Sequence, residues 1–368
     1  MRAIDATSPD VTVAAPGPEF EAWRSGVRRD ALRHVAEFVE TRCEPQLRQT
    51  GVDIAGEVLA GFLDGGKCLR STFMYLGWLT GADADESALR ASAGLEMLHA
   101  FALLQDDVMD DSPLRRGLPA AHVRFGQWHR DRGLSGSDER FGASLAILLS
   151  DLCLVWAEQM MRESGVAAEA LARAWPHYDA MRIELAVGQC ADVAGNAGAL
   201  PDLDAVLEVA RRKSGNYTVR RPLEIGAAMA GRADLVEVLG GYGGALGEAF
   251  QLRDDILGVF GSPGVTGKPV GGDLAERKAT SVVVAAQRMA DAAIGRQFTE
   301  LAAAESLDDS DIERWRTLIV ATGAPEWIEA LIAERVATAN RFIGDERIDD
   351  WTRATLADMA AVCTLRLT

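Results

Sequence analysis

Apolar residues recur along most of this chain at every third or fourth position, which is the spacing of one face of an α-helix. Alanine and leucine are abundant, whereas runs of alternating β-branched residues are scarce. The pattern therefore predicts a protein that is almost entirely α-helical. The predicted helices cover residues 19–49, 52–63, 67–80, 84–111, 119–128, 138–163, 166–195, 202–213, 215–230, 232–259, 277–305, 309–322, 324–343 and 350–365.

Clusters of glycine, proline and serine separate the predicted helices where loops are expected. These clusters lie at residues 65–66, 112–113, 133–136, 261–264 and 271–272. No linker-like stretch or change of composition divides the chain internally. Residues 1–18 are polar, proline-rich and acidic, with neither a basic start nor an apolar run, so we expect a flexible leader and no signal peptide. The remaining residues, 19–368, are expected to form one domain.

Composition narrows the classes of function. The chain of 368 residues carries a net charge of −17 and has no basic stripe, so we expect no nucleic-acid partner. Its five cysteines are odd in number and scattered without metal-type spacing, which favours a reduced, cytoplasmic setting. The sequence shows no uninterrupted apolar stretch that is long enough to span a bilayer, so we expect no transmembrane segment.

Two clusters of aspartates interrupt otherwise apolar helical stretches. The first is DDVMD at residues 106–110, and the second is DDILG at residues 254–258. Asp106 and Asp110 stand four apart on a predicted helix, so their carboxylates project from one face. Facing carboxylates in an apolar setting stay ionised when a hard cation such as Mg²⁺ neutralises them, and Mg²⁺ is usually shared with substrate phosphate. The clusters therefore indicate a diphosphate held through magnesium between two helices.

An acidic pair alone is most often a solvated surface patch in a chain with 55 acidic residues, so the neighbouring segments matter. Arg115 and Arg116 follow the first cluster in a loop marked by proline and glycine, and paired guanidiniums suit phosphate oxygens. Lys67 and Arg70 follow a glycine turn at the start of a predicted helix, where backbone N–H groups also bind anions. Each signal is weak by itself, but together they favour a phosphate site.

These segments occur in an order that resembles the trans-isoprenyl diphosphate synthases, the polyprenyl synthetase family. MLHAFALLQDD at residues 97–107, with RRG at residues 115–117, resembles the first aspartate-rich motif and its arginine loop. FQLRDDILGVFG at residues 250–261 resembles the second motif, and TGKP at residues 266–269 resembles the lysine loop that follows. The resemblance runs from about residue 50 to residue 290.

The resemblance implies the isoprenoid synthase fold, which is a single large antiparallel helical bundle around a central cavity. It implies a prenyltransferase that condenses isopentenyl diphosphate head to tail with an allylic prenyl diphosphate, with Mg²⁺ as cofactor. It also implies a homodimer formed by long helices near the active site. Residues 84–111 and 138–163 are the candidates for that interface.

The resemblance assigns roles to individual residues. Mg²⁺ is expected to bind Asp106, Asp110 and Asp254, with Asp107 and Asp255 as close support. The allylic diphosphate is expected to bind Arg115, Lys213 and Lys268, and isopentenyl diphosphate to bind Lys67, Arg70, His99 and Arg116. The path of the allylic cation is expected to be lined by Ser214 and Gln251. Taken alone, His99 is more typical of a core histidine, and Lys213 and Lys268 of solvated charges.

Product length is predicted from the helical turn before the first cluster. Ala102 and Phe101 lie about 6 and 7.5 Å before Asp106 along a helix axis, where a growing prenyl tail would run. In similar synthases an aromatic residue at the fifth position upstream with a small fourth residue resembles the geranylgeranyl (C20) pattern. We therefore expect C20, with farnesyl (C15) second. Ordinary core packing of Phe101 is the competing interpretation.

Several residues depart from the family pattern. Cys68 stands where arginine is usual, Ser71 where proline is common, Gln105 where histidine often precedes the acidic pair, and Ser214 where threonine is usual. The second cluster ends in Gly258 instead of a third aspartate, and residues 272–280 lack an acid and a base seen in many relatives.

Two other functions stay open. A type I terpene cyclase would ionise a similar substrate, but it would carry an Asn/Ser/Glu metal triad on the later helix. A non-catalytic subunit of a heteromeric synthase is suggested by Cys68 and Gly258. Such subunits commonly lose an aspartate-rich motif, whereas the first motif is intact here.

Overall fold

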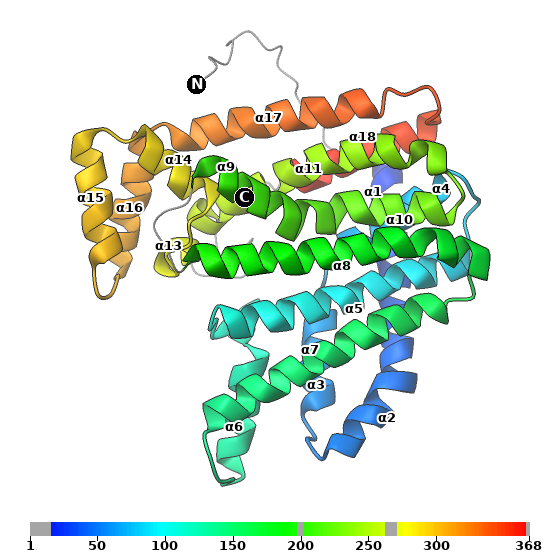
Figure 1. The fold of residues 1–368 in the computed structure, drawn as a ribbon, viewed down its shortest axis with the longest axis horizontal. Coiled ribbons are helices and arrows are strands. Elements are labelled where there is room, and N and C mark those ends of the chain that lie inside the picture. The colour runs from blue at the N-terminus through cyan, green and yellow to red at the C-terminus, as the bar shows by residue number, and fades with distance from the viewer. Residues whose placement is uncertain (1–15, 197–201, 262–270, 366–368) are drawn as a thin grey trace.

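The structure is a computed structural model that describes residues 16–196, 202–261 and 271–365. Nearly all of these residues are helical, which confirms the predicted all-α fold (Figure 1). The first helices are α1 (Pro18–Phe38), α2 (Glu44–Leu47), α3 (Ala55–Leu63), α4 (Leu69–Leu79), α5 (Glu86–Met109), α6 (Ala121–Asp131), α7 (Asp138–Arg162) and α8 (Ala168–Asn196). The later ones are α9 (Leu203–Ala210), α10 (Arg221–Met229), α11 (Ala233–Phe260), α13 (Gly272–Ala275), α14 (Ser281–Met289), α15 (Ala292–Ala303), α16 (Asp309–Ala321), α17 (Ala324–Phe342) and α18 (Asp350–Thr364).

Four shorter elements complete the described chain. Two are π-helices, η1 (Val39–Cys43) and η3 (Arg211–Arg220), and one is a 3₁₀ turn, η2 (Arg48–Thr50). The fourth is an antiparallel hairpin of β1 (Leu114–Arg115) and β2 (Leu118–Pro119). The predicted leader, residues 1–18, lies mostly outside the described residues, and α1 already begins at Pro18.

The long helices pack in adjacent rows (Figure 1). α7 packs on α5, α10 packs on both α8 and α11, and α17 packs on α11. Buried apolar side chains form three groups. One joins α1, α3, α5, α7 and α8, a second joins α4, α10, α11 and α18, and a third joins α11, α14, α16 and α17. Because α5 and α11 are internal helices, the aspartate clusters that they carry are held inside the bundle, where ionised groups need partners or a cavity.

Residues 213–215 do not interrupt a helix, so the predicted break there was wrong. α9 continues through η3 into α10. A β-carbon at Gly215 would lie 2.8 Å from the carbonyl carbon of Gly247, because the two helix backbones touch at this point. Gly215 therefore allows close packing of η3 against α11 and does not break the helix. Single turns of π-helix are frequent at functional sites.

The predicted helix over residues 277–305 was also wrong, because it consists of α14 and α15. Ala290 and Asp291 between them have extended backbones, with ψ of 138° and 173°. The Asp291 carboxylate accepts hydrogen bonds from the backbone N–H groups of Ala293 at 2.8 Å and Ile294 at 2.9 Å. This side chain starts a new helix where the apolar pattern alone ran on without a break.

By length and composition α7 could cross a bilayer, so the expectation that no stretch is long enough was wrong for this helix. It packs against α5 and α6, however, and Ala146, Leu149, Cys153 and Trp156 belong to the first core group. No other helix in the described part of the chain meets the same requirement. The core helix of a globular bundle can be as long and as apolar as a membrane span. We therefore interpret α7 as a bundle helix with an apolar outer face.

Candidate active site

A single large cavity of about 2140 Å³ opens between α5, α8, η3 and α11. It is lined by thirteen predicted site residues, namely Lys67, Arg70, His99, Phe101, Ala102, Asp106, Arg115, Arg116, Lys213, Ser214, Gln251, Asp254 and Asp255. Asp107 and Asp110 lie beside the cavity without lining it. Lys268 lies outside the described residues. The structure therefore brings together residues that are far apart in the sequence.

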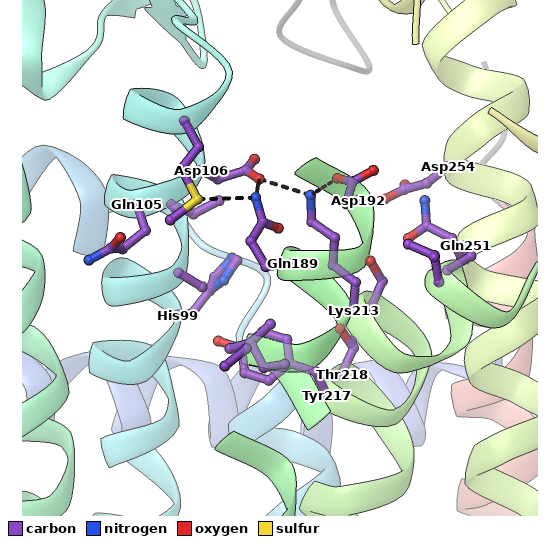
Figure 2. Close-up of a pocket in the computed structure, with 18 of the residues that line it drawn as sticks. His99, Gln105, Asp106, Gln189, Asp192, Lys213, Tyr217, Thr218, Gln251 and Asp254 are labelled. Carbon is purple, nitrogen blue, oxygen red and sulfur yellow. Dashed lines mark hydrogen bonds and ion pairs between the residues drawn. The ribbon is translucent and has the colours of Figure 1, made fainter. Parts of the chain in front are cut away.

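The first aspartate cluster forms the last turn of α5, which ends at Asp110 as its C-cap. Lys213 Nζ from η3 lies 3.0 Å from Asp106 Oδ1 and 2.6 Å from Asp192 Oδ2 of α8 (Figure 2). Burial alone would raise the pKa of Asp106, but Lys213 and Arg115 outweigh it and hold the pKa below its ordinary value. The same carboxylates raise the pKa of Lys213 despite its burial. Asp106 and Lys213 are therefore both charged at neutral pH.

The hairpin after α5 places the two arginines of the predicted loop. Its two-residue turn consists of Arg116 and Gly117, with φ of 53° and 77°, and such turns need positive φ at both positions. Arg115 Nε donates to Asp107 Oδ1 at 2.8 Å, and Arg115 also contacts Asp106. Arg116 donates to the backbone oxygen of Asp64 at 2.6 Å, and burial next to Arg115 lowers the pKa of Arg116. Two neighbouring guanidiniums thus border the cavity.

Asp107 and Asp255 are the buried members of the two clusters. The Asp107 side chain is fully buried against Arg115, and its Oδ2 accepts no hydrogen bond from the described residues. Asp255 accepts hydrogen bonds from Ser281 N and Oγ at 2.9 and 2.6 Å and from Gln251 Nε2 at 2.8 Å. Burial raises the pKa of Asp255 to about 6, although these donors oppose the rise. Both side chains anchor the ends of neighbouring segments, and their supporting roles at the metal stay a prediction.

Lys278 was not given a role from the sequence. Its Nζ lies 3.0 Å from Asp110 Oδ2 and 2.9 Å from Glu276 Oε2. Glu276 and Asp110 raise the pKa of Lys278 above its ordinary value, although burial acts in the opposite direction. The segment after α11 is thereby tied to the end of α5.

A second group of polar side chains lies on another wall of the same cavity. Arg70 donates to Thr218 Oγ1 at 3.0 Å, and its guanidinium lies 4.3 Å from the centre of the Tyr217 ring. The buried Arg70 Nε has no hydrogen-bond partner among the described residues. Burial, Arg70 and both arginines of the hairpin hold the pKa of His99 well below its ordinary value. His99 is therefore neutral, and the wall keeps unsatisfied donors for an anion.

The π-helix η3 supplies two residues to the cavity that the sequence analysis missed. Tyr217 and Thr218 line it together with Lys213 and Ser214. The backbone of η3 approaches α8 closely at Gly188. A β-carbon there would lie only 2.9 Å from Lys213 N, so the lack of a side chain at Gly188 permits this approach. Two polar side chains of α8 that were given no role from the sequence, Gln189 and Asp192, also line the cavity (Figure 2). Their spacing of three residues on a predicted helix was the available signal.

Phe101 and Ala102 line the cavity one turn before Asp106, as predicted. Leu154 of α7 and Ile183 of α8 line it with them, so this part of the wall is apolar. Phe101 also packs against the first core group, and its backbone oxygen accepts a hydrogen bond from Ser150 Oγ at 3.1 Å. The interpretation of Phe101 as core packing and its predicted place beside a prenyl tail are thus both compatible with its position.

The chemistry of the carboxylates fits a divalent cation that also has other ligands. In the described part of the chain no three His, Cys, Asp or Glu side chains are grouped closely enough to hold a metal by themselves. Asp106 and Asp254 instead face the cavity from opposite helices, with Lys213 between them (Figure 2). Hard oxygen ligands on two sides of a cavity suit Mg²⁺, which keeps several waters and completes its shell with phosphate oxygens.

Known proteins share this sequence and fold. The family model described as polyprenyl synthetase matches residues 53–319. The geranylfarnesyl diphosphate synthase of Aeropyrum pernix is 33% identical over 269 residues, which are 72% of this chain and 79% of that protein. The geranylgeranyl diphosphate synthase of Mycobacterium tuberculosis is 33% identical over 277 residues, which are 74% of this chain and 73% of that protein.

One solved structure is similar over almost the whole chain. It is the geranylgeranyl pyrophosphate synthase from Corynebacterium glutamicum, complexed with isoprenyl diphosphate and magnesium. The two chains are 36% identical and superpose with a TM-score of 0.87, covering 95% of this chain and 99% of that one. The likeness therefore extends to the helices that form the cavity.

Proposed function

The chain belongs to the polyprenyl synthetase family and is a prenyltransferase, and we propose that it condenses isopentenyl diphosphate with allylic prenyl diphosphates to make geranylgeranyl diphosphate. The observation that carries this proposal is one cavity with two groups of cationic side chains and an apolar wall between α5, α7 and α8. Two diphosphates and one growing hydrocarbon tail need these three environments.

The allylic diphosphate would bind at the aspartate clusters. Asp106, Asp110 and Asp254 would hold Mg²⁺, which when bound supplies Lewis-acid stabilisation of the departing diphosphate. Lys213 and Arg115 already lie against Asp106, and Lys278 lies against Asp110. These cations would neutralise the phosphate oxygens as the C–O bond breaks, without having to move far. The predicted role of Lys268 on this side stays a prediction.

Isopentenyl diphosphate would bind at the second group. Arg70 and Arg116 offer guanidiniums that suit phosphate oxygens, and Lys67 lines the same part of the cavity. His99 is neutral there, so it would donate one hydrogen bond and add no charge. The two diphosphates would thus be fixed separately, which brings the alkene of one substrate near the allylic carbon of the other.

Other polar groups that line the cavity would accompany the allylic cation without reacting with it. Ser214 and Gln251 would present oxygens along the path of the allylic cation, and Tyr217, whose pKa burial raises to about 12, would stay neutral. Among the carboxylates that line the cavity, Asp106 is paired with Arg115 and Lys213, and Asp255 accepts a hydrogen bond from Gln251. As the family resemblance implies, the departing pyrophosphate would therefore take the proton that leaves the new prenyl chain.

The product prediction can be tested directly. We expect purified protein with isopentenyl diphosphate, Mg²⁺ and C5, C10 or C15 primers to give C20 as its longest main product. We expect Phe101→Ala to move the main product to longer chains, because it removes an aromatic ring from the apolar wall, and Ala102→Phe to move it to shorter ones. Product chain length, measured by chromatography or mass spectrometry, checks both changes.

The control for this experiment is Leu318→Ala, an apolar truncation on α16 in the third core group. It should leave the product distribution of the wild type. Unchanged products in both Phe101→Ala and Ala102→Phe would show that other residues set the length. A main product of C15 from wild-type protein would favour the farnesyl alternative. No condensation with any primer would contradict the proposed activity and support a non-catalytic subunit.

We further propose that two copies of the chain associate through the outer face of α7. Of the two predicted candidates, α5 is internal to the monomer. α7 by contrast exposes Ile147, Leu148 and Val155 with relative exposures of 40, 57 and 57%. These three side chains share the exposed side of α7 with Asp151, and a two-fold contact would cover their apolar surface on both copies.

Sedimentation velocity at micromolar concentration is expected to give a dimer for the wild type. Leu148→Glu should shift it to monomer, because it places a charge in the centre of the apolar face. Val320→Glu on α16 is the matched control, since Val320 is also half exposed but lies on another part of the molecule. A wild-type monomer, or a Leu148→Glu dimer, would count against this interface.

The free state of the cysteines agrees with the expected reduced, cytoplasmic setting. Cys43, Cys68 and Cys153 are buried and Cys190 is exposed, and all four are free thiols. Burial raises the pKa of Cys43 to about 12 and that of Cys153 well above its ordinary value, so both are inert at neutral pH. A reduced, cytoplasmic protein therefore stays our proposal.

A further inference from the structure

The second aspartate cluster ends in a glycine, and a carboxylate from another segment occupies the space next to it. A β-carbon at Gly258 would lie 1.8 Å from Asp273 Oδ2 and 2.6 Å from Asp273 Cγ. No real side chain tolerates such a contact, so any residue other than glycine at position 258 would displace the Asp273 carboxylate. The glycine and the position of Asp273 are thus one structural feature.

Gly258 stands four residues after Asp254 on α11, so the two positions share one face of the helix. Asp254, Gly258 and Asp273 all line the cavity. The Asp273 carboxylate therefore reaches the same wall as Asp254, at the place where a side chain of residue 258 would begin. We infer that Asp273 supplies the carboxylate that residue 258 lacks, and that it acts with Asp254 to bind the divalent cation of the second cluster.

The short helix α13 sets the position of Asp273. It begins after Gly271, whose φ of 69° suits glycine, and Leu274 is buried in the third core group. Lys278 N donates to Asp273 O at 2.8 Å, so one turn of chain fixes both residues. This turn places the Asp273 carboxylate against Gly258 and the Lys278 ammonium group against Asp110. Asp273 is also close enough to Asp255 to contribute to the raised pKa of that residue.

The chemistry of this pair suits a hard cation. Asp254 and Asp273 bring carboxylate oxygens to one wall of the cavity from two segments of the chain. Mg²⁺ prefers such oxygen ligands and keeps the rest of its shell for water and phosphate. This inference rests on the proposed function, because that function brings the diphosphate that would complete the shell.

Cation binding, and not turnover, tests the inference. We expect Asp273→Asn to weaken the binding of Mg²⁺ in the presence of inorganic pyrophosphate by about 10- to 100-fold, measured by isothermal titration calorimetry. Gly258→Ala should weaken it similarly although no charge is removed, because the new β-carbon displaces Asp273. Asp350→Asn is the matched control and should bind as the wild type does, because the Asp350 side chain is fully exposed on α18.

A rescue variant gives a second test. Gly258→Asp in the Asp273→Ala background returns one carboxylate to this wall and removes the side-chain atoms that a β-carbon at residue 258 would meet, so Mg²⁺ binding should recover at least partly relative to Asp273→Ala alone. Circular dichroism of each variant checks that the helical fold persists. Wild-type binding in both Asp273→Asn and Gly258→Ala would overturn the inference, as would failure of the rescue in a folded variant.

Asp106→Asn separates this inference from the proposed function. If Asp106→Asn loses Mg²⁺ binding with pyrophosphate while Asp273→Asn does not, the site stands and the role of Asp273 is wrong. If neither variant affects binding, the proposed magnesium–diphosphate site itself is wrong, and the role of Asp273 falls with it.

Discussion

Asp106→Ala and Asp254→Ala are each expected to lower kcat/KM by about 10³-fold or more while the helical fold persists. Electrostatic groups that act on the departing charge typically contribute at least this much, and the residues of such a site act as a unit. Asp106 is the carboxylate on which Lys213, Arg115 and Gln189 converge, and Asp254 faces it across the cavity. Steady-state kinetics at saturating Mg²⁺ measure the loss.

Asp111→Asn is the matched control for these variants. Asp111 follows the first cluster directly but its side chain is fully exposed, and asparagine tolerates its positive φ of 49°. We expect this variant to keep wild-type kinetics. Near-normal rates in Asp106→Ala or Asp254→Ala would show that the carboxylates do not hold the metal. Circular dichroism would separate a catalytic loss from unfolding, since Lys213 keeps Asp192 as a partner when Asp106 is removed.

Arg70→Ala and Lys278→Ala are expected to affect different substrates. Arg70 lies on the wall with His99 and Tyr217, so its loss should raise the KM for isopentenyl diphosphate about 100-fold and change the KM for the allylic primer little. Lys278 contacts Asp110, so its loss should act on the allylic KM or on kcat. The sequence predicts that Lys268→Ala, like Lys278→Ala, acts on the allylic KM or on kcat. Initial rates with each substrate varied in turn measure the difference.

Arg70→Lys provides the matched comparison, because it keeps the charge but loses the planar fork that binds two phosphate oxygens. Its KM for isopentenyl diphosphate should lie between those of the wild type and Arg70→Ala. The same kinetic pattern in Arg70→Ala and Lys278→Ala would mean that the cavity does not separate the two diphosphates as proposed.

Local patterns in the chain predicted most of the helices and most of the residues that line the cavity. Apolar spacing predicted the all-α fold, because a helix that packs on one face repeats that face every three or four residues. The two aspartate clusters, the arginine pair and the glycine turn were visible because each is contiguous in sequence. Thirteen of the predicted residues line one cavity, although their contacts could not be derived from the spacing.

Features that depend on contacts between two distant segments could not be predicted from the sequence of either segment alone. Gly215 resembled a helix breaker, but its contact with Gly247 belongs to the packing of η3 on α11. Lys278 was given no role from the sequence, and only the fold places its ammonium group 3.0 Å from Asp110 Oδ2. The break between α14 and α15 depended on a single capping side chain, Asp291, inside a continuous apolar pattern.

The sequence by itself determined which segments are helical and which residues carry charge, because these properties depend on neighbours within one or two helical turns. Only the tertiary structure decided which charges meet. Lys213 reaches Asp106 and Asp192, and Asp273 reaches the space left by Gly258, because helices distant in sequence pack together. Gly258 alone looks like a lost aspartate, whereas in the folded chain it is the gap that admits another carboxylate. The reason is physical: long-range packing fixes distances that a one-dimensional pattern does not contain.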